Sequence, residues 1–197
     1  AADDQKRPVF FWIHGGGYRT GQGAVPWYNG AQFAKQGDIV TVSINYRMGA
    51  LGFTDLSRFG PQYATSGVNG ILDQITALEW VRDNIAAFGG DPSQVTIGGE
   101  SAGAFAVSTL LGSPRAQGLF QRAIAQSGAA QHTLTTEAGG IVTDALLAAL
   151  QASDMADLQA ASVDDILAAQ AQIDLEMRAG LSSRLGSVAP FYPVAGN

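Results

Sequence analysis

The residues Gly99-Glu100-Ser101-Ala102-Gly103 fit the pattern G-x-S-x-G, which can present a serine for nucleophilic chemistry. The central serine of this pattern sits on a sharp strand-to-helix turn whose strained backbone leaves no room for bulk two residues away. Gly99 and Gly103 provide that room, and a helix beginning after Ser101 points amide groups toward the oxygen that becomes negative during attack. The alternative interpretation is an ordinary glycine-rich turn. Neither a phosphate-loop lysine nor a G-x-G-x-x-G pattern accompanies it, so nothing supports a nucleotide site.

A glycine triplet within FFWIHGGGYRTG, residues 10–21, provides the second group needed for acyl transfer. Acyl transfer needs at least two backbone N–H donors aimed at the developing oxyanion, each contributing about 3 kcal/mol. Glycines directly after a strand let the backbone approach a substrate carbonyl without an intervening side chain. We expect Gly16 and Gly17 to donate N–H groups, and Ala102 to donate a third. An HGGG stretch upstream of G-x-S-x-G is the pairing found in lipases and esterases of the α/β-hydrolase class.

A base that takes the proton of Ser101 cannot be assigned within the chain. The triad of α/β-hydrolases runs serine, acid, histidine along the sequence. The first carboxylate after Ser101 is Glu137, and no histidine follows His132, so this order cannot be assembled. We expect His14 to hold the glycine loop, with a catalytic role as the alternative. His132 is expected in a solvated loop, with a place in the pocket lining as the alternative.

Strands and helices alternate in the part of the chain that must position these residues. Strands are predicted for four short runs rich in β-branched and aromatic residues: Val9–Ile13, Ile39–Asn45, Val95–Ile97 and Ala123–Gln126. These runs are nearly continuous in apolar residues, which favours strands covered on both faces, as in a parallel sheet. Helices are predicted over Asn69–Phe88, from apolar residues every three or four positions, and over Ala102–Leu111. This alternation predicts an α/β fold with a mostly parallel central sheet and flanking helices.

The character of the sequence changes near residue 137. The later region is rich in alanine, has helical periodicity and lacks strand signals, and Ser162 with Asp165 forms a capping box that opens a helix. We therefore predict two parts. Residues 1–136 form the core that carries the glycine loop and the serine turn, and residues 137–197 form a helical segment that packs on the core or caps it. A membrane or partner surface is the alternative reading of the apolar stripe in this region.

Composition excludes several classes of function. The 197 residues suffice for one domain, and their net charge of −6 argues against nucleic acid as a partner. The sequence contains no cysteine, so disulfides, thiolate metal sites and cysteine nucleophiles are excluded within this chain. The two histidines lack the spacing of a metal pair, and the expected chemistry needs neither metal nor cofactor. No apolar run is long enough for a membrane span or a signal-peptide core, and the cellular compartment is not readable.

The sequence resembles the type-B carboxylesterases, the family that includes cholinesterases and bacterial p-nitrobenzyl esterases. The matching blocks are WIHGGGY, NYRMGALGF over Asn45–Phe53, the long block GVNGILDQITALEWVRDNIAAFGGDPSQVTIGGESAG over Gly67–Gly103, and LFQRAIAQSGA over Leu119–Ala129. The likeness is dense from Pro8 to about Ala130 and diffuse afterwards. It implies a partial α/β-hydrolase fold and a serine esterase with a small-molecule ester as substrate.

The resemblance also assigns roles to single residues. Ser101 is implied to be the nucleophile, on a turn that Gly99 and Gly103 permit. Its oxyanion hole is implied to consist of Gly16, Gly17 and Ala102. Glu100 and Ser127 are implied to support the catalytic histidine and acid. The residues alone give a plainer reading of these two, in which Glu100 is a charge paired in the turn and Ser127 caps a strand end.

Members of this family are far longer, and their acid and histidine follow further strands that this chain does not reach. We therefore expect a fragment truncated at both ends, whose end VAPFYPVAGN resembles an internal stretch of the family. The remainder of the hydrolase is then needed to complete the triad, and the isolated 197 residues are expected to be inactive. The alternatives are a non-catalytic adhesion or binding protein of the same fold, and an inert structural fragment.

Overall fold

The computed structural model describes residues 5–130, 132–179 and 189–196. The chain forms two compact units. The first unit comprises Ala1–Tyr46 and Ile71–Gln131, and the second comprises Arg47–Gly70 and His132–Asn197. The expected division into residues 1–136 and 137–197 stays a prediction.

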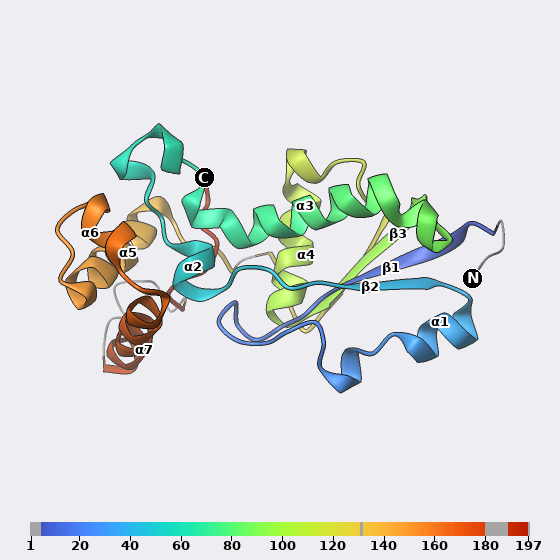
Figure 1. The fold of residues 1–197 in the computed structure, drawn as a ribbon, viewed down its shortest axis with the longest axis horizontal. Helices are drawn as coiled ribbons and strands as arrows, with labels where there is room; N and C mark the ends of the chain where they lie inside the picture. Colours follow the sequence, from blue (N-terminus) through green and yellow to red (C-terminus); the bar gives the residue numbers. More distant parts are fainter. Residues whose placement is uncertain (1–4, 131, 180–188, 197) are drawn as a thin grey trace. The chain divides into compact units, whose positions relative to one another are not determined.

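A four-stranded parallel sheet forms the centre of the first unit (Figure 1). Its strands are β1 (Arg7–Ile13), β2 (Val40–Ser43), β3 (Gly90–Glu100) and β4 (Arg122–Gln126), in the order β2-β1-β3-β4. Every neighbouring pair is parallel, and Phe11 of β1 lies level with Ile97 of β3, which lies level with Ala123 of β4. The predicted parallel sheet is therefore confirmed, and each of the four strands overlaps one of the predicted apolar runs.

The third strand begins earlier than predicted. The predicted strand begins at Val95, whereas β3 already starts at Gly90, which lies level with Arg7 of β1. The register shifts between Arg7 and Val9, so the pairing is irregular beside Pro92. Proline has no N–H to donate to a ladder, and such an irregularity is one of the places where a strand tolerates it.

Helices flank this sheet on both sides. Helix α3 (Asn69–Asn84) continues into a 3-10 turn (Ile85–Phe88), and its predicted apolar positions are all buried: Ile71, Ile75, Leu78, Val81 and Ile85. Helix α4 (Ala102–Gly112) packs against β1, β3 and β4. Helix α1 (Ala31–Gly37), which the sequence analysis did not predict, lies beside β2, on the other side of the sheet from α3 in Figure 1.

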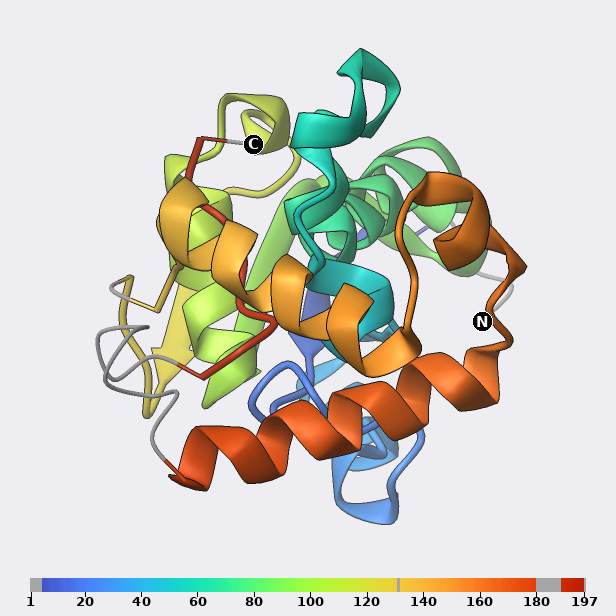
Figure 2. The same ribbon diagram turned by 90° about the vertical axis from the view of Figure 1, so that its left-hand side faces the viewer.

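The second unit is mostly helical among its described residues. It contains α2 (Gly49–Phe53), α5 (Thr136–Leu150), α6 (Met155–Ala160) and α7 (Val163–Ala179), with short 3-10 turns over Ser57–Phe59, Pro61–Tyr63 and Ser66–Val68. Helices α5 and α7 pack against each other, as Figure 2 shows. The predicted capping box is confirmed, because Ser162 Oγ accepts from the N–H of Asp165 at 3.1 Å and donates to its carboxylate at 2.6 Å.

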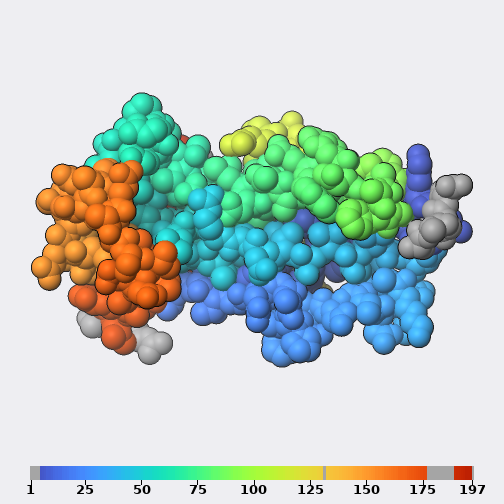
Figure 3. Space-filling model, in the orientation of Figure 1, coloured from blue at the N-terminus to red at the C-terminus, as the bar shows by residue number. Residues whose placement is uncertain are grey.

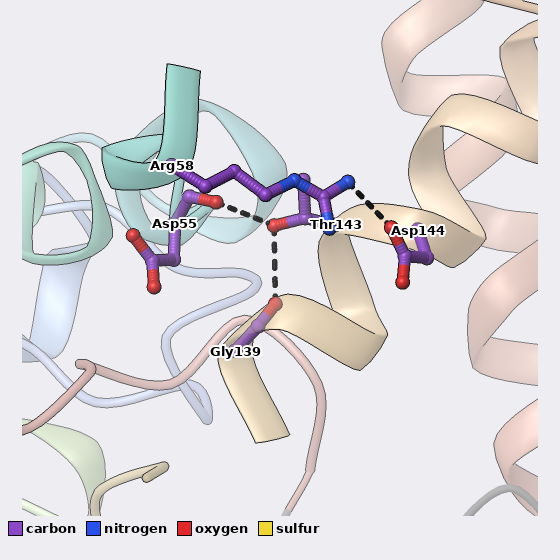
Figure 4. Close-up of polar contacts among 5 residues, drawn as sticks. All are labelled: Asp55, Arg58, Gly139, Thr143 and Asp144. Atoms are coloured by element: carbon purple, nitrogen blue, oxygen red, sulfur yellow. Dashed lines mark hydrogen bonds and ion pairs between the residues drawn. The ribbon is translucent and has the colours of Figure 1, made fainter. Parts of the chain in front are cut away.

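Polar contacts tie the loop after α2 to α5 within this second unit (Figure 4). The hydroxyl of Thr143 lies 2.7 Å from the carbonyl oxygen of Asp55 and 3.0 Å from that of Gly139. Arg58 forms an ion pair with Asp144 one residue further along α5. Thr143 is fully buried, so its hydroxyl is satisfied where an unpaired one would cost about 1–3 kcal/mol.

Candidate active site

Ser101 occupies a sharp turn between β3 and α4, as predicted. Its backbone angles are φ 54° and ψ −120°, in a region that a non-glycine residue adopts only under constraint. The turn is held from both sides. Ser101 donates its N–H to the carbonyl oxygen of Gln126 in β4 at 2.9 Å, and its own carbonyl accepts from Ala104 and Phe105 of α4 at 2.9 and 3.0 Å. The strained conformation is therefore fixed by the sheet and the helix together.

The two glycines that flank the serine are required by close backbone contacts. A Cβ on Gly99 would lie 2.4 Å from the carbonyl carbon of Gly103, and a Cβ on Gly103 would lie 2.1 Å from the carbonyl oxygen of Ile13. Both distances are shorter than any real Cβ contact, and in each case the obstacle is backbone that cannot rotate away. The predicted reason for glycine at these two positions therefore has a direct counterpart in the structure.

The glycine loop lies directly against this turn. A Cβ on Gly15 would lie 2.6 Å from the carbonyl oxygen of Glu100 and 3.2 Å from Cβ of Ser101. Side-chain-free backbone therefore passes within contact distance of the serine. The sequence analysis gave Gly15 no role of its own, although its place at the start of the triplet was the available signal.

The two following glycines hold conformations that suit a loop with free amide groups. Gly16 has φ 113° and Gly17 has φ 62°. The loop is closed by Arg19 and Thr20, whose N–H groups both donate to the carbonyl oxygen of Gly16 at 3.1 Å. A Cβ on Gly17 would meet nothing within 4 Å, so this residue borders open space. No acceptor among the described residues takes the N–H of Gly16, Gly17 or Ala102.

His14 is buried at the base of this loop. Its Nδ1 lies 2.8 Å from the carbonyl oxygen of Gly15, and because a carbonyl only accepts, Nδ1 carries the hydrogen. Burial lowers the pKa of His14, and the hydrogen bond to Gly15 opposes this shift without cancelling it. Neither His14 nor any other described residue forms a hydrogen bond with the Ser101 hydroxyl. These contacts support the loop-holding role expected of His14.

Tyr46 completes the support of His14, a role that the sequence analysis missed. The two rings stack with their centroids 4.6 Å apart, and the Tyr46 hydroxyl donates to the His14 carbonyl oxygen at 2.8 Å. Burial raises the pKa of the Tyr46 phenol, so it keeps the proton that it donates. No local pattern around Tyr46 indicated this contact, because it joins the segment after β2 to the segment after β1, 32 residues apart in the sequence.

The two expected supporting residues lie on either side of the serine turn. The half-buried Glu100 ends β3, and its carboxylate oxygen lies 3.1 Å from the Cβ position of Gly15. Ser127 follows β4 with φ 56°, so each of the neighbouring strands β3 and β4 is followed by a serine with a positive φ. Gly128 comes next, and a Cβ there would lie 2.8 Å from the Ser101 carbonyl oxygen. The roles of Glu100 and Ser127 toward an acid and a histidine stay predictions.

Other candidate residues lie outside this cluster. Trp27 and Tyr28 line a groove in the first unit whose lining includes neither Ser101 nor the glycine triplet. Phe53 is 1% exposed and belongs to the buried core of the second unit. His132 belongs to the second unit, where its ring lies 6.2 Å from that of Tyr192.

None of the described helices combines the length and apolar character needed to cross a membrane. Within the same part of the chain, no group of three or more histidine, aspartate or glutamate residues is placed to hold a metal ion.

Comparisons with known proteins place this geometry in context. The profile of the carboxylesterase family matches residues 1–196. The para-nitrobenzyl esterase of Bacillus subtilis is 45% identical over 168 residues, which cover 84% of this chain and 34% of that protein. A crystal structure of a Geobacillus stearothermophilus carboxylesterase matches with a TM-score of 0.87 and 45% identity, over 98% of this chain and 39% of that one.

The similarity extends to a protein that is not named as a hydrolase. Neuroligin-2 of Mus musculus is 43% identical over 155 residues, which cover 79% of this chain and 18% of that protein. The chain thus spans little more than a third of the length of the Bacillus esterase and of the Geobacillus carboxylesterase. The likeness to the Geobacillus structure confirms the predicted partial α/β-hydrolase fold.

Proposed function

The chain belongs to the type-B carboxylesterase family, and from this membership we propose that it carries the nucleophile and the oxyanion-binding groups of a carboxylic ester hydrolase. In this proposal Ser101 is the nucleophile, and the N–H groups of Gly16, Gly17 and Ala102 bind the oxyanion. The observation that carries the proposal is the contact between the glycine loop and the strained serine turn, with Gly15 against Cβ of Ser101.

The reaction has two steps. The Ser101 oxygen attacks the ester carbonyl carbon while a base takes its proton, and the carbonyl oxygen becomes an oxyanion that the three N–H groups stabilise. The carbon–oxygen bond to the alcohol then breaks, and the alcohol leaves with the proton from the base. Water attacks the acyl-serine in the same manner, releasing the carboxylic acid and restoring the hydroxyl of Ser101.

The base and the acid that orients it lie outside this chain in our proposal. His14 uses its Nδ1 hydrogen to hold Gly15, and no acid and later histidine follow Ser101 in the required order. The remainder of a carboxylesterase polypeptide is therefore the partner that completes the triad. The substrate class is a small-molecule ester, in keeping with the family.

The experiment is a chimera in which this chain replaces the matched region of the Bacillus subtilis para-nitrobenzyl esterase. We expect it to hydrolyse p-nitrobenzyl esters and to react with a fluorophosphonate at Ser101, as read by peptide mass spectrometry. Ser101→Ala removes the labelling and lowers hydrolysis by about 10⁴-fold or more. Ser108→Ala is the matched control, because Ser108 lies on α4 with its hydroxyl 3.0 Å from the Ala104 carbonyl oxygen.

The alternative function is partner binding without catalysis, which the similarity to neuroligin-2 favours. The strained backbone of Ser101 argues against it, because such strain costs about 1–3 kcal/mol and is found mainly at active sites and ligand-binding sites. A chimera with native circular dichroism that neither hydrolyses the ester nor reacts with the fluorophosphonate would support the binding function and reject the esterase.

A further inference from the structure

Tyr18 directly follows the glycine triplet and differs from the residues around it. Its side chain is fully buried, whereas most of the residues that follow it, blue to light blue in Figure 3, lie at the surface of the unit. Gly16, Gly17 and Tyr18 all have a positive φ, and the value for Tyr18 is 58°. Glycine adopts such angles without strain, but a bulky side chain does so rarely. Something other than backbone preference therefore holds Tyr18 in this conformation.

The Tyr18 ring contacts two other aromatic rings. Its centroid lies 6.4 Å from that of Tyr46, in an edge-on arrangement, and 6.4 Å from that of Phe105. Both separations are within the range at which aromatic rings attract each other. The Phe105 ring is itself confined, because it lies so close to Gly128 that a Cβ there would come within 2.8 Å of Cδ1. Burial of the Tyr18 ring among these neighbours offsets the backbone strain of this residue.

The two neighbouring rings belong to the two halves of the candidate active site. Tyr46 supports the glycine loop, since its hydroxyl donates to the His14 carbonyl oxygen. Phe105 belongs to α4, and its N–H donates to the Ser101 carbonyl oxygen at 3.0 Å. The Tyr18 ring, which touches both, therefore links the glycine loop to the helix that follows the serine.

The glycine triplet needs such a link because it has no side chains of its own to pack. The N–H groups of Gly16 and Gly17 have no acceptor among the described residues, so hydrogen bonds of these two groups do not fix the loop either. The side chains next to the triplet are those of His14 before it and Tyr18 after it. His14 holds the first end through the carbonyl oxygen of Gly15. The second end is left to Tyr18.

We propose that Tyr18 is a positioning residue, which fixes the N–H groups of Gly16 and Gly17 relative to Ser101. This inference rests on the proposed function, in which these N–H groups bind the oxyanion. Oxyanion donors act only when they are held at hydrogen-bond distance from the oxygen that becomes negative during attack. The donors contribute mainly in the transition state, so loss of the Tyr18 ring lowers kcat and leaves KM almost unchanged.

The first test is Tyr18→Leu in the chimera with the Bacillus subtilis para-nitrobenzyl esterase. Leucine keeps an apolar side chain and the same backbone strain, but it removes the ring. We expect kcat for a p-nitrobenzyl ester to fall about tenfold or more, with KM within about threefold of the original. Fluorophosphonate labelling of Ser101 slows in parallel, because the phosphonyl oxygen uses the same donors. Tyr18→Phe keeps the ring and is expected to retain at least about half of kcat.

Ile85→Ala is the matched control for a loss of stability alone. Ile85 is 2% exposed and packs beside Gly90, at the opposite end of β3 from Ser101. We expect Ile85→Ala to lower the melting temperature at least as much as Tyr18→Leu, and to leave kcat within about twofold. Equal losses of kcat in these two variants would overturn the positioning role, and so would a Tyr18→Leu variant that keeps full kcat.

Phe105→Leu tests the same contact from the side of α4, and it carries the test if Tyr18→Leu does not fold. We expect it to lower kcat as well, because it removes the second ring of the pair. The double variant is expected to lose less than the product of the two single losses, since both act on one contact. Losses of kcat that multiply would show that Tyr18 and Phe105 act independently and would overturn the link.

Hydrogen exchange of the 197-residue chain tests the loop without catalysis. The N–H groups of Arg19 and Thr20 both donate to the Gly16 carbonyl oxygen, so their exchange reports opening of the loop. Relative to the N–H groups of β1, Tyr18→Leu is expected to raise their exchange about tenfold or more, whereas Ile85→Ala leaves this ratio within about threefold. An unchanged ratio in Tyr18→Leu would contradict the anchoring of the loop by Tyr18.

The outcomes separate this inference from the proposed function. A chimera that is inactive without any substitution, in a chain whose loop exchange responds to Tyr18→Leu alone, supports Tyr18 as the anchor of the loop and rejects the esterase. An active chimera that Ser101→Ala inactivates and Tyr18→Leu leaves at full kcat supports the esterase and rejects the positioning role.

Discussion

Ser101 and its neighbours show how backbone contacts, rather than side chains, shape this candidate site. The serine keeps a strained conformation with a positive φ because the N–H and C=O of its own backbone are held by β4 and α4. Gly15, Gly99 and Gly103 each touch other backbone at distances that exclude a side chain. The site is therefore specified by where side chains are missing.

Replacing Gly103 with alanine tests whether close backbone contacts exclude a side chain at this position. A Cβ at Gly103 would lie 2.1 Å from the Ile13 carbonyl oxygen, so Gly103→Ala is expected to lower the free energy of unfolding by about 2–4 kcal/mol. Gly112→Ala is the matched control, because Gly112 ends α4 and has open space at its Cβ position. We expect that variant to be neutral or more stable by up to about 1 kcal/mol. Urea unfolding of the 197-residue chain measures both, and equal effects would contradict the packing described here.

The buried imidazole of His14 predicts a pH dependence of stability. Burial lowers its pKa below 6.5 in the folded state, whereas the unfolded chain binds a proton near pH 6.5. The free energy of unfolding is therefore expected to fall as the pH drops below 6.5, and to stop falling once the pH reaches the folded pKa. His14→Phe removes this part of the slope. Urea unfolding of the two proteins between pH 7.5 and about 5 measures it, and identical slopes would contradict it.

Among the helices and strands, the sequence predicted those that a local pattern of apolar residues specifies. The apolar runs located the four strands, and the spacing of Ile71, Ile75 and Leu78 located α3. It did not predict α1, whose exposed seven residues have no apolar face to bury. It also placed the start of the third strand at Val95 instead of Gly90, because the pairing of Gly90 with Arg7 is a contact between distant parts of the chain.

The N-terminal cap of α6 gives a prediction about the stability of a single helix. Asp154 accepts from the N–H groups of Ala156 and Asp157 at 2.8 and 3.0 Å and so satisfies two amides at the start of the helix. Asp154→Ala is expected to lower the free energy of unfolding by about 1 kcal/mol, since both amides lose their acceptor. Asp154→Asn keeps an acceptor and is expected to stay within about 0.5 kcal/mol of the original. Chemical denaturation measures both, and equal losses in the two variants would show that the cap contributes nothing.

Across the whole molecule, the sequence predicted the class of the active site but not the contacts between distant segments that surround it. The order of serine, carboxylates and histidines already indicated that the triad is incomplete. The contact of Gly15 with Ser101, the stacking of Tyr46 on His14 and the groove over Trp12 each join segments distant in sequence. No local pattern encodes such contacts. They follow only once the sheet has brought the ends of β1, β2 and β3 together.

The isolated 197-residue chain is expected to be catalytically inert for the same reason. Without a general base near Ser101, its turnover of p-nitrophenyl esters should not exceed that of the Ser101→Ala variant by more than about tenfold. A spectrophotometric assay of both proteins at equal concentration measures this. Rapid turnover that survives His14→Ala and His132→Ala would show that the base lies elsewhere in this chain.

The most direct test of the central claim is a crystal structure of the chimera after reaction with a fluorophosphonate. The phosphonyl group imitates the tetrahedral intermediate, so its oxygen reports where the oxyanion is held. We predict a phosphonyl group bonded to the Ser101 oxygen, with its own oxygen about 3 Å from the backbone nitrogens of Gly16, Gly17 and Ala102. A phosphonyl oxygen that points away from the glycine loop, or a label on another residue, would contradict the account.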